Sequence, residues 1–377
     1  MTDYSFGALR RLVVKIGSAL LVDSDGRFAR ERLDQIAEDI AALHQQGQEV
    51  LVVSSGAVAI GCSILDLNRR RARLEELQAA AAAGQVQLVR AWQESLSEHG
   101  IRAAQILLTP DDTEVRRRFL NARGTLNKLL EFRVIPVINE NDTVATDELR
   151  YGDNDRLAAR VAQLVMADGL VLLSDVDGFY DSDPRGNPEA VHIPLVRDVT
   201  DDVLARAGGS GSVLGSGGMR TKLLAARIAT HAGCVTVIAS GHVDHPLRTL
   251  AAGGRCTVFM PEGSPAAIRK QWLAGILEVR GSLRVDAGAQ KALESGSSLL
   301  PVGLVEVQGD FRRGDAVQLL GPGGRELGRG LASYASEEAS AIVGCRSEEI
   351  EERLGYRGRS VIVHRDDLVL FGQAGRK

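Results

Sequence analysis

With 377 residues, 44% of them hydrophobic, the chain is longer than one hydrophobic core usually supports, so two domains are expected. Its 45 basic and 49 acidic residues give a net charge of −4, which offers no electrostatic reason to expect nucleic acid as the main partner. Four scattered cysteines and the lack of any apolar run near the ~20 residues of a membrane span argue against a disulfide framework and a membrane protein, so a cytoplasmic location is expected.

Strand-like and helix-like stretches alternate along the first two thirds of the chain. Apolar and β-branched runs predict strands at 12–16, 49–54, 101–108, 133–138 and 169–173, and apolar residues at helical spacing predict helices at 30–46, 73–98, 113–131 and 155–166. This alternation predicts an α/β fold, a three-layer α/β/α sandwich with a mostly parallel central sheet. After about residue 275, short β-like runs broken by glycine predict a small separate domain like a β-barrel. The expected domains are residues 1–275 and 276–377.

Two clusters of acid and amide residues lie in one connection of the first domain. Residues 139–142 are Asn, Glu, Asn and Asp and follow the predicted strand at 133–138, whereas residues 152–155 are Gly, Asp, Asn and Asp and lead into the next helix. One such cluster is typical of an Asx-rich turn with a helix cap. Two clusters beside one strand end favour a binding site, because open α/β sheets bind ligands outside the carboxyl ends of their strands.

The sequence contains neither a P-loop nor a dinucleotide-binding signature. Residues 208–222 are rich in glycine and lead into a helix-like stretch, so their backbone N–H groups and Lys222 suit a phosphate, although a flexible surface loop has a similar composition. Lys15 ends an apolar strand beside Gly17, which favours an anion site over a solvated strand end. With the small residues at 54–59, these turns predict one cleft.

Six motifs, at 13–18, 53–57, 139–142, 152–155, 174–180 and 217–222, resemble in this order the motifs of the amino acid kinase family. Residues 119–123 and the C-terminal module make the resemblance specific for the glutamate 5-kinases, the first enzymes of proline synthesis. The segment from 281 to about 358 resembles a PUA domain. The resemblance covers essentially the whole chain and implies transfer of the γ-phosphoryl group of MgATP to the side-chain carboxylate of L-glutamate, which gives L-glutamyl 5-phosphate.

The resemblance also implies a role for each matching residue. Lys15 and Lys222 would be catalytic and flank the transferring group, with Asp155 orienting both lysines. Ser55, Asp142 and Asn154 would bind glutamate, with Asp142 accepting from its ammonium group and Asn154 near a carboxylate. The nucleotide site would comprise Lys15, Ser174, Asp175, Ser216, Gly217, Gly218, Met219, Arg220, Thr221 and Lys222.

The implied reaction makes modest chemical demands on the protein. A glutamate side chain has a reference pKa of about 4.3 and is ionised at neutral pH, so no general base is needed. The protein mainly positions two anions and stabilises charge on the transferring oxygens. ATP and Mg²⁺ are the implied cofactors, but no carboxylate cage is readable, so no residue is assigned to a metal.

The family further implies a homodimer or homotetramer, feedback inhibition by L-proline, and hand-over of glutamyl phosphate to glutamate-5-semialdehyde dehydrogenase. Two alternatives remain open: an RNA-binding protein acting through the PUA-like domain, or a kinase of the same fold acting on acetylglutamate, aspartate or a nucleotide. Residues 276–377 hold 14 basic and 15 acidic residues, whereas a phosphate-binding surface is clearly basic, so nucleic acid is not expected as the principal ligand. The PUA-like tail and residues 139–142 favour free glutamate.

Overall fold

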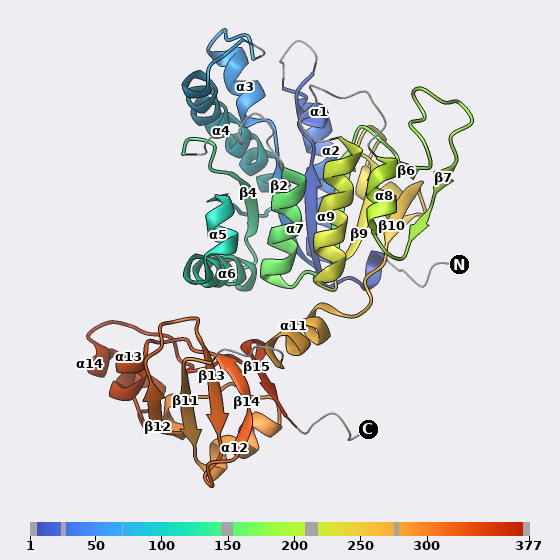
Figure 1. Cartoon of the computed structure of the whole chain (residues 1–377). Coiled ribbons are helices and arrows are strands. Elements are labelled where there is room, and N and C mark those ends of the chain that lie inside the picture. The colour runs from blue at the N-terminus through green and yellow to red at the C-terminus, as the bar shows by residue number, and fades with distance from the viewer. Residues whose placement is uncertain are drawn as a thin grey trace. The chain divides into compact units, whose positions relative to one another are not determined.

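The computed structural model describes residues 6–23, 28–69, 71–144, 154–207, 218–274 and 279–371. The chain divides into two compact units, Met1–Pro265 and Ala266–Lys377, which are described separately (Figure 1). Helix α11 (Pro265–Ala274) begins at this division, whereas the boundary expected from the sequence lies after the helix.

The first unit contains an eight-stranded sheet with the order β3-β4-β2-β1-β5-β9-β10-β8. Its strands are β1 (Arg11–Ile16), β2 (Glu49–Ser54), β3 (Ala103–Leu108), β4 (Ile135–Glu140), β5 (Gly169–Ser174), β8 (Leu195–Val196), β9 (Val235–Ser240) and β10 (Cys256–Phe259). Neighbouring strands run parallel except β9 and β10. A separate antiparallel ribbon joins β6 (Phe179–Tyr180) and β7 (His192–Ile193).

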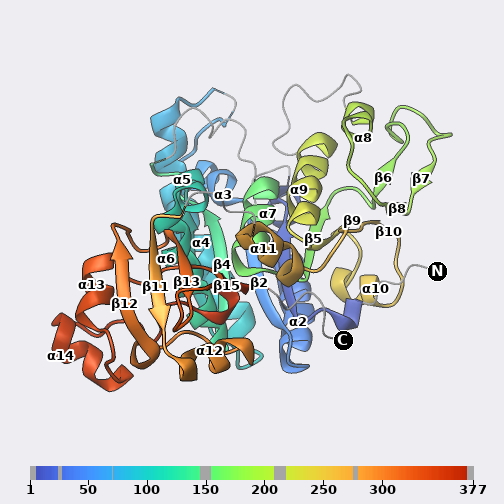
Figure 2. The same ribbon diagram turned by 60° about the horizontal axis from the view of Figure 1, so that its bottom comes forward.

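Helices cover both faces of this sheet (Figures 1 and 2). One face carries α1 (Ser18–Leu21), α2 (Arg30–Gln45), α3 (Ala57–Ile64), α4 (Leu74–Ser97) and α10 (Pro246–Ala251), and the other carries α5 (Pro110–Glu114), α6 (Arg116–Glu131), α7 (Asn154–Val165), α8 (Asp201–Arg206) and α9 (Met219–His231). Successive residues of β1 serve opposite layers, because Val14 packs into the first core and Val13 into the second. The predicted three-layer α/β sandwich is confirmed.

Two element boundaries differ from the sequence-based expectation for local reasons. The single helix predicted at 113–131 is divided into α5 and α6, because Val115 is extended at the junction, with ψ 114°. Thr109 and Asp112 form a capping box that starts α5 just before this point. The strand predicted at 133–138 starts instead at Ile135, because Arg133 adopts a left-handed conformation, with φ 57°, after α6 ends.

The second unit is a small β domain, as the sequence predicted. Its five-stranded sheet has the order β12-β11-β13-β14-β15 and is antiparallel except between β11 and β13. The elements are β11 (Gly281–Val285), α12 (Ala287–Glu294), β12 (Leu304–Gly309), β13 (Ala316–Leu320), β14 (Glu326–Leu331), α13 (Ser336–Ala341), α14 (Ile350–Leu354) and β15 (Leu368–Leu370). Leu283, Phe311 and Val317 belong to its own buried core. Across the parts of the chain that the structure describes, no helix has the length and apolar character needed to cross a membrane.

Short 3-10 helices also occur in both units. They are η1 (Phe6–Ala8) in the first unit and η3 (Pro301–Gly303), η4 (Ser347–Glu349) and η5 (Arg365–Asp367) in the second.

Candidate active site

Four neighbouring strands of the large sheet end at one hollow. Strands β1, β2, β4 and β5 run parallel, so their carboxyl ends meet at the same edge of the sheet. Lys15, Ser55, Asn139 and Ser174 lie at or next to these ends and line the hollow. About 830 Å³ of space free of protein atoms, part of it open to solvent, lies between them.

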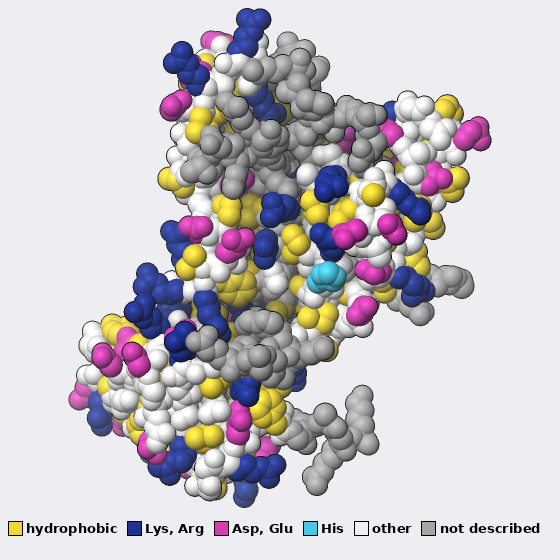
Figure 3. Space-filling model, viewed as in Figure 1, with side chains coloured by type: hydrophobic (Ala, Val, Ile, Leu, Met, Phe, Trp, Pro, Cys, Tyr) yellow, Lys and Arg dark blue, Asp and Glu magenta, His cyan; other side chains and the backbone are white. Residues whose placement is uncertain are grey.

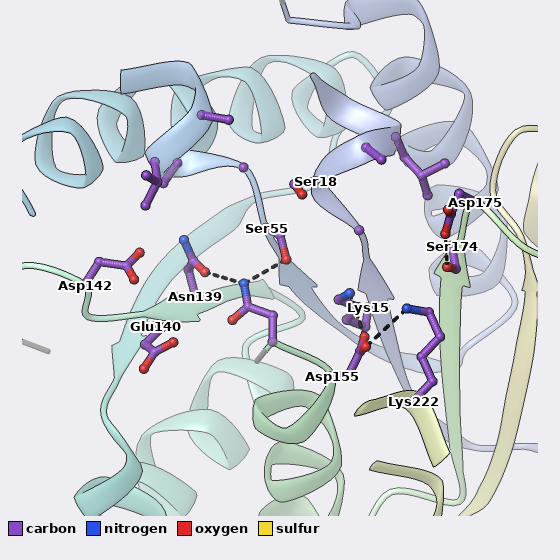
Figure 4. A pocket seen from close by; sticks show the side chains of 18 of the residues that line it. Lys15, Ser18, Ser55, Asn139, Glu140, Asp142, Asp155, Ser174, Asp175 and Lys222 are labelled. Carbon is purple, nitrogen blue, oxygen red and sulfur yellow. Dashed lines mark hydrogen bonds and ion pairs between the residues drawn. The ribbon is translucent and has the colours of Figure 1, made fainter. Parts of the chain in front are cut away.

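Lys15, Asp155 and Lys222 form a buried charged group on one side of this hollow (Figure 4). The Nζ of Lys15 lies 2.6 Å from Oδ1 of Asp155, and the Nζ of Lys222 lies 3.3 Å from Oδ2. Thr221 donates a hydrogen bond to Oδ2 at 2.9 Å. Burial alone would raise the pKa of Asp155, but the charges of Lys15 and Lys222 outweigh burial and hold that pKa below its ordinary value. Two cations therefore share one anion. The group has a net positive charge, which favours binding of a further anion.

The local structure explains why these three side chains meet. Lys15 shares the face of β1 that carries Val13, and that face packs against α7 and α9. Asp155 lies in the first turn of α7, and Lys222 lies in the first turn of α9 after the N-cap Gly218. Both helices therefore begin at the edge of the sheet where β1 ends, and helix N-termini favour negative charge.

A chain of amide side chains lies beside the charged group. Asn154 donates through Nδ2 to the Oγ of Ser55 at 2.8 Å and to the Oδ1 of Asn139 at 3.0 Å. Asn139 in turn donates through Nδ2 to the Oε1 of Gln85, on α4, at 2.8 Å. Among the described residues, the buried Oδ1 of Asn154 has no hydrogen-bond partner. The polar atom that Asn154 leaves available is thus an acceptor, which favours an ammonium group over the carboxylate expected from the sequence.

Acidic side chains lie on the other side of the amide chain. Figure 4 shows Ser55 and Asn139 between Asp142 and Lys15. Burial and the nearby charge of Glu140, opposed by the charge of Arg69, together raise the pKa of Asp142 to about 7. All three charged residues line the hollow. A cationic ligand group would relieve the repulsion between the two carboxylates.

The expected nucleotide residues are described only in part. Ser174 and Asp175 follow one another at the end of β5 and line the hollow, and Ser174 donates to Oδ1 of Asp175 at 2.8 Å. Gly218 caps α9, and Met219, Arg220, Thr221 and Lys222 form its first turn. Ser216 and Gly217 lie outside the described residues.

The hollow therefore gathers most of the residues chosen from the sequence. The expected site residues that line it are Lys15, Ser55, Asp142, Asn154, Asp155, Ser174, Asp175 and Lys222. Sequence reasoning missed Arg69, which stands in a run of arginines that is typical of a solvated surface. It also missed Gln85, although one signal was available: this residue lies on the same helical stripe as the buried Ala81, Leu88 and Trp92.

Comparisons with known proteins show the family of this chain. The model of the Amino acid kinase family matches residues 10–240, and the model of the PUA domain matches residues 281–354. A protein named Glutamate 5-kinase from Nitrobacter hamburgensis is 54% identical over 100% of this chain and 99% of its own length. Glutamate 5-kinase 1 of Rhizobium meliloti is 56% identical over 98% of this chain and 94% of its own, and Glutamate 5-kinase of Agrobacterium fabrum is 56% identical over 99% and 96%.

Proposed function

Because this chain belongs to the amino acid kinase family, in its glutamate 5-kinase branch with a PUA domain, we propose how the hollow carries out that branch's reaction. The protein is an enzyme that transfers a phosphoryl group from ATP to the side-chain carboxylate of L-glutamate. The product, L-glutamyl 5-phosphate, is the first intermediate of proline biosynthesis.

The buried group of Lys15, Asp155 and Lys222 is the observation that supports the proposed chemistry. Glutamate arrives with its side chain ionised, so the protein must bring two anions together rather than remove a proton. Lys15 and Lys222 stabilise the negative charge on the transferring phosphoryl oxygens, because they lie in a site where water screens little. Asp155 holds both ammonium groups toward the same point.

The opposite side of the hollow recognises the backbone end of glutamate. The carboxylate of Asp142 and the Oδ1 of Asn154 both accept hydrogen bonds from its ammonium group. Arg69, an exposed cation that lines the same hollow, meets its α-carboxylate. Ser55 then lies toward the side-chain carboxylate, on the side of Lys15 (Figure 4). An N-acetylated glutamate lacks the cation that Asp142 requires, so free glutamate is the better fit.

The nucleotide lies on the side of Ser174, Asp175 and the first turn of α9. Within the described ranges, no group of three acidic, histidine or cysteine side chains is placed to hold a metal ion. The carboxylate of Asp155 is already shared by two lysines. Asp175, which lines the hollow on that side, would be the protein carboxylate that holds a Mg²⁺ ion bound to the nucleotide. When bound, Mg²⁺ neutralises part of the phosphate charge.

Several properties of the assembly follow from the family rather than from the site. The enzyme is proposed to be a cytoplasmic homodimer or homotetramer, to be inhibited by L-proline, and to pass its labile acyl phosphate to glutamate-5-semialdehyde dehydrogenase. Nucleic acid is not proposed as a ligand, because Figure 3 shows basic and acidic side chains together on the visible face of the second unit. Sedimentation of the purified enzyme tests its oligomeric state, and initial rates with and without proline test the inhibition.

A panel of phosphate acceptors tests the proposed substrate. Purified enzyme receives MgATP with L-glutamate, N-acetyl-L-glutamate, L-aspartate or UMP. Release of ADP measures turnover of every acceptor, and hydroxylamine traps any acyl phosphate as a hydroxamate. Turnover is expected with L-glutamate and not with the other three acceptors. Faster turnover of any other acceptor would contradict the assignment.

A further inference from the structure

Gln85 is a buried polar residue that does not line the hollow, yet it is connected to the glutamate side of it. Only 8% of its surface is exposed, and its neighbours along the buried stripe of α4 are apolar. Burying an amide costs free energy unless its polar groups are paired. Gln85 pairs only its Oε1, which accepts from Asn139, while its Nε2 has no partner among the described residues. The acceptor atom of Gln85 therefore binds Asn139, whereas its donor atom binds no described residue.

The hydrogen bonds transmit the orientation of Gln85 along the amide chain. Because Gln85 presents an acceptor, Asn139 turns its NH₂ toward Gln85 and its Oδ1 toward Asn154. That Oδ1 takes one hydrogen of the Asn154 amide, and Ser55 takes the other. Each amide has one donor end and one acceptor end, so reversing the first would reverse the others. The orientation at Gln85 thus decides whether Asn154 offers Oδ1 or NH₂ to a ligand.

We propose that Gln85 is a positioning residue for glutamate, which acts through Asn139 to keep the Oδ1 of Asn154 toward the substrate's ammonium group. This inference rests on the proposed function and deepens it. An ammonium group has three donors, and Oδ1 of Asn154 and the carboxylate of Asp142 supply two acceptors for them. A reversed amide chain would present NH₂ to the ammonium group and repel it. Gln85 therefore contributes to selection for a free amino group without touching it.

Two substitutions at this position separate the acceptor from the packing. Gln85→Glu keeps the shape of the side chain and offers only acceptors to Asn139. Gln85→Leu fills similar space but removes the acceptor. At pH 8, Gln85→Glu is expected to keep the glutamate KM within about twofold of the wild type, whereas Gln85→Leu raises it roughly tenfold, in keeping with a lost hydrogen bond to a charged group. The KM for ATP and kcat are expected to change by less than about twofold in both variants.

A double substitution tests the route of the effect. In an Asn154→Ala background, Gln85→Leu is expected to have no further effect on the glutamate KM, because the route through Asn154 no longer exists. Wild-type turnover of glutamate, measured alongside, tests the proposed function separately. If Gln85→Leu does not fold, as judged by its melting curve, Gln85→Met takes its place in the same comparisons.

Three outcomes would overturn the proposal. An unchanged glutamate KM in Gln85→Leu would show that Gln85 has no positioning role. An equal rise in the KM for glutamate and for ATP would show a general packing defect. A glutamate KM in Gln85→Glu as poor as that in Gln85→Leu would show that the amide chain runs in the opposite direction.

Discussion

The Nζ of Lys15 lies 2.6 Å from Oδ1 of Asp155, although the first residue belongs to the first strand of the sheet and the second to helix α7. Both side chains are almost fully buried, with 8% and 1% of their side-chain surfaces exposed. A lone buried charge is costly, so this pair holds the end of β1 and the start of α7 together. The same pair also fixes one of the two cations proposed to meet the phosphoryl group.

Replacing Lys222 with methionine is expected to impair turnover far more than folding. Its charge acts on oxygens that become more negative during transfer, so kcat should fall by roughly 10²- to 10³-fold, the usual effect of one lost electrostatic donor. Asp155 keeps Lys15 as a partner in this variant. Steady-state kinetics and a melting curve are the measurements, and Lys128→Met, at a surface position on α6, is the control. A near-normal kcat in Lys222→Met would remove this lysine from the mechanism.

Asp155→Asn is expected to lower the free energy of unfolding by an amount that depends on pH. At neutral pH the variant leaves two buried lysines without their shared anion, so the free energy of unfolding should fall by about 3–5 kcal/mol. The folded-state pKa of Asp155 lies below the ordinary value of 3.8. Its ionised form therefore stabilises the fold fully above pH 3.8, and this contribution is lost as pH falls through the folded-state pKa.

Urea unfolding of the wild type and Asp155→Asn at several pH values measures this contribution. The difference between the two proteins should be constant from pH 7 to about pH 5 and shrink only below about pH 4, near the reference pKa of a carboxyl group. A difference that has already disappeared at pH 6 would mean that Asp155 is protonated in the folded protein.

Glutamate binding is expected to weaken as pH falls through 7. The pKa of Asp142 is raised to about 7 in the free enzyme, so its carboxylate is largely ionised at pH 8 and about one tenth ionised at pH 6. Because the ammonium group requires the ionised form, the glutamate KM should rise by roughly tenfold between these pH values. The KM for ATP, measured in parallel, should stay nearly constant.

Two variants connect this pH dependence to Asp142. Asp142→Asn should remove it and weaken glutamate binding at pH 8 by roughly 10- to 150-fold, since hydrogen bonds to charged groups contribute about 1.5–3 kcal/mol. Glu140→Gln should move the dependence to lower pH, because the charge of Glu140 raises the pKa of Asp142. An unchanged profile in Asp142→Asn would assign the titration to another group.

Removing residues 276–377 is expected to leave a folded kinase. Every residue that lines the hollow belongs to the first compact unit, and the second unit has a core of its own. The truncated protein should keep its kcat for glutamate while its sedimentation or its response to proline changes. Complete loss of activity in a truncation with a normal melting curve would show that the second unit completes the site.

The sequence predicted the fold well because its signals were local. Buried strands such as β2 read as continuous apolar runs, and helices such as α2 carry apolar residues at helical spacing. Once the strands are parallel, their ends must meet at one edge, so Lys15, Ser55 and Ser174 were expected to lie together. The assigned roles of these residues stay predictions.

The parts that sequence reasoning missed depend on contacts between distant segments. Gln85 matters through its bond to Asn139, and nothing along α4 shows which strand that side chain will reach. The two hydrogen bonds that occupy the NH₂ of Asn154 are likewise made to Ser55 and Asn139 in distant segments, so the sequence did not show which atom of that amide is left available. Arg69 was not selected because it lies in a run of arginines that is typical of a solvated surface.

The amide chain also connects the two helical layers through hydrogen bonds. Gln85 belongs to α4 in one layer, Asn154 begins α7 in the other, and Asn139 bridges them from the end of β4. A substrate that binds Asn154 therefore stiffens the hydrogen-bonded amide chain, which crosses the edge of the sheet from α7 to α4. We therefore expect slower hydrogen–deuterium exchange in α4 when glutamate is added. This helix lies in the layer opposite α7, and its Gln85 does not contact the substrate.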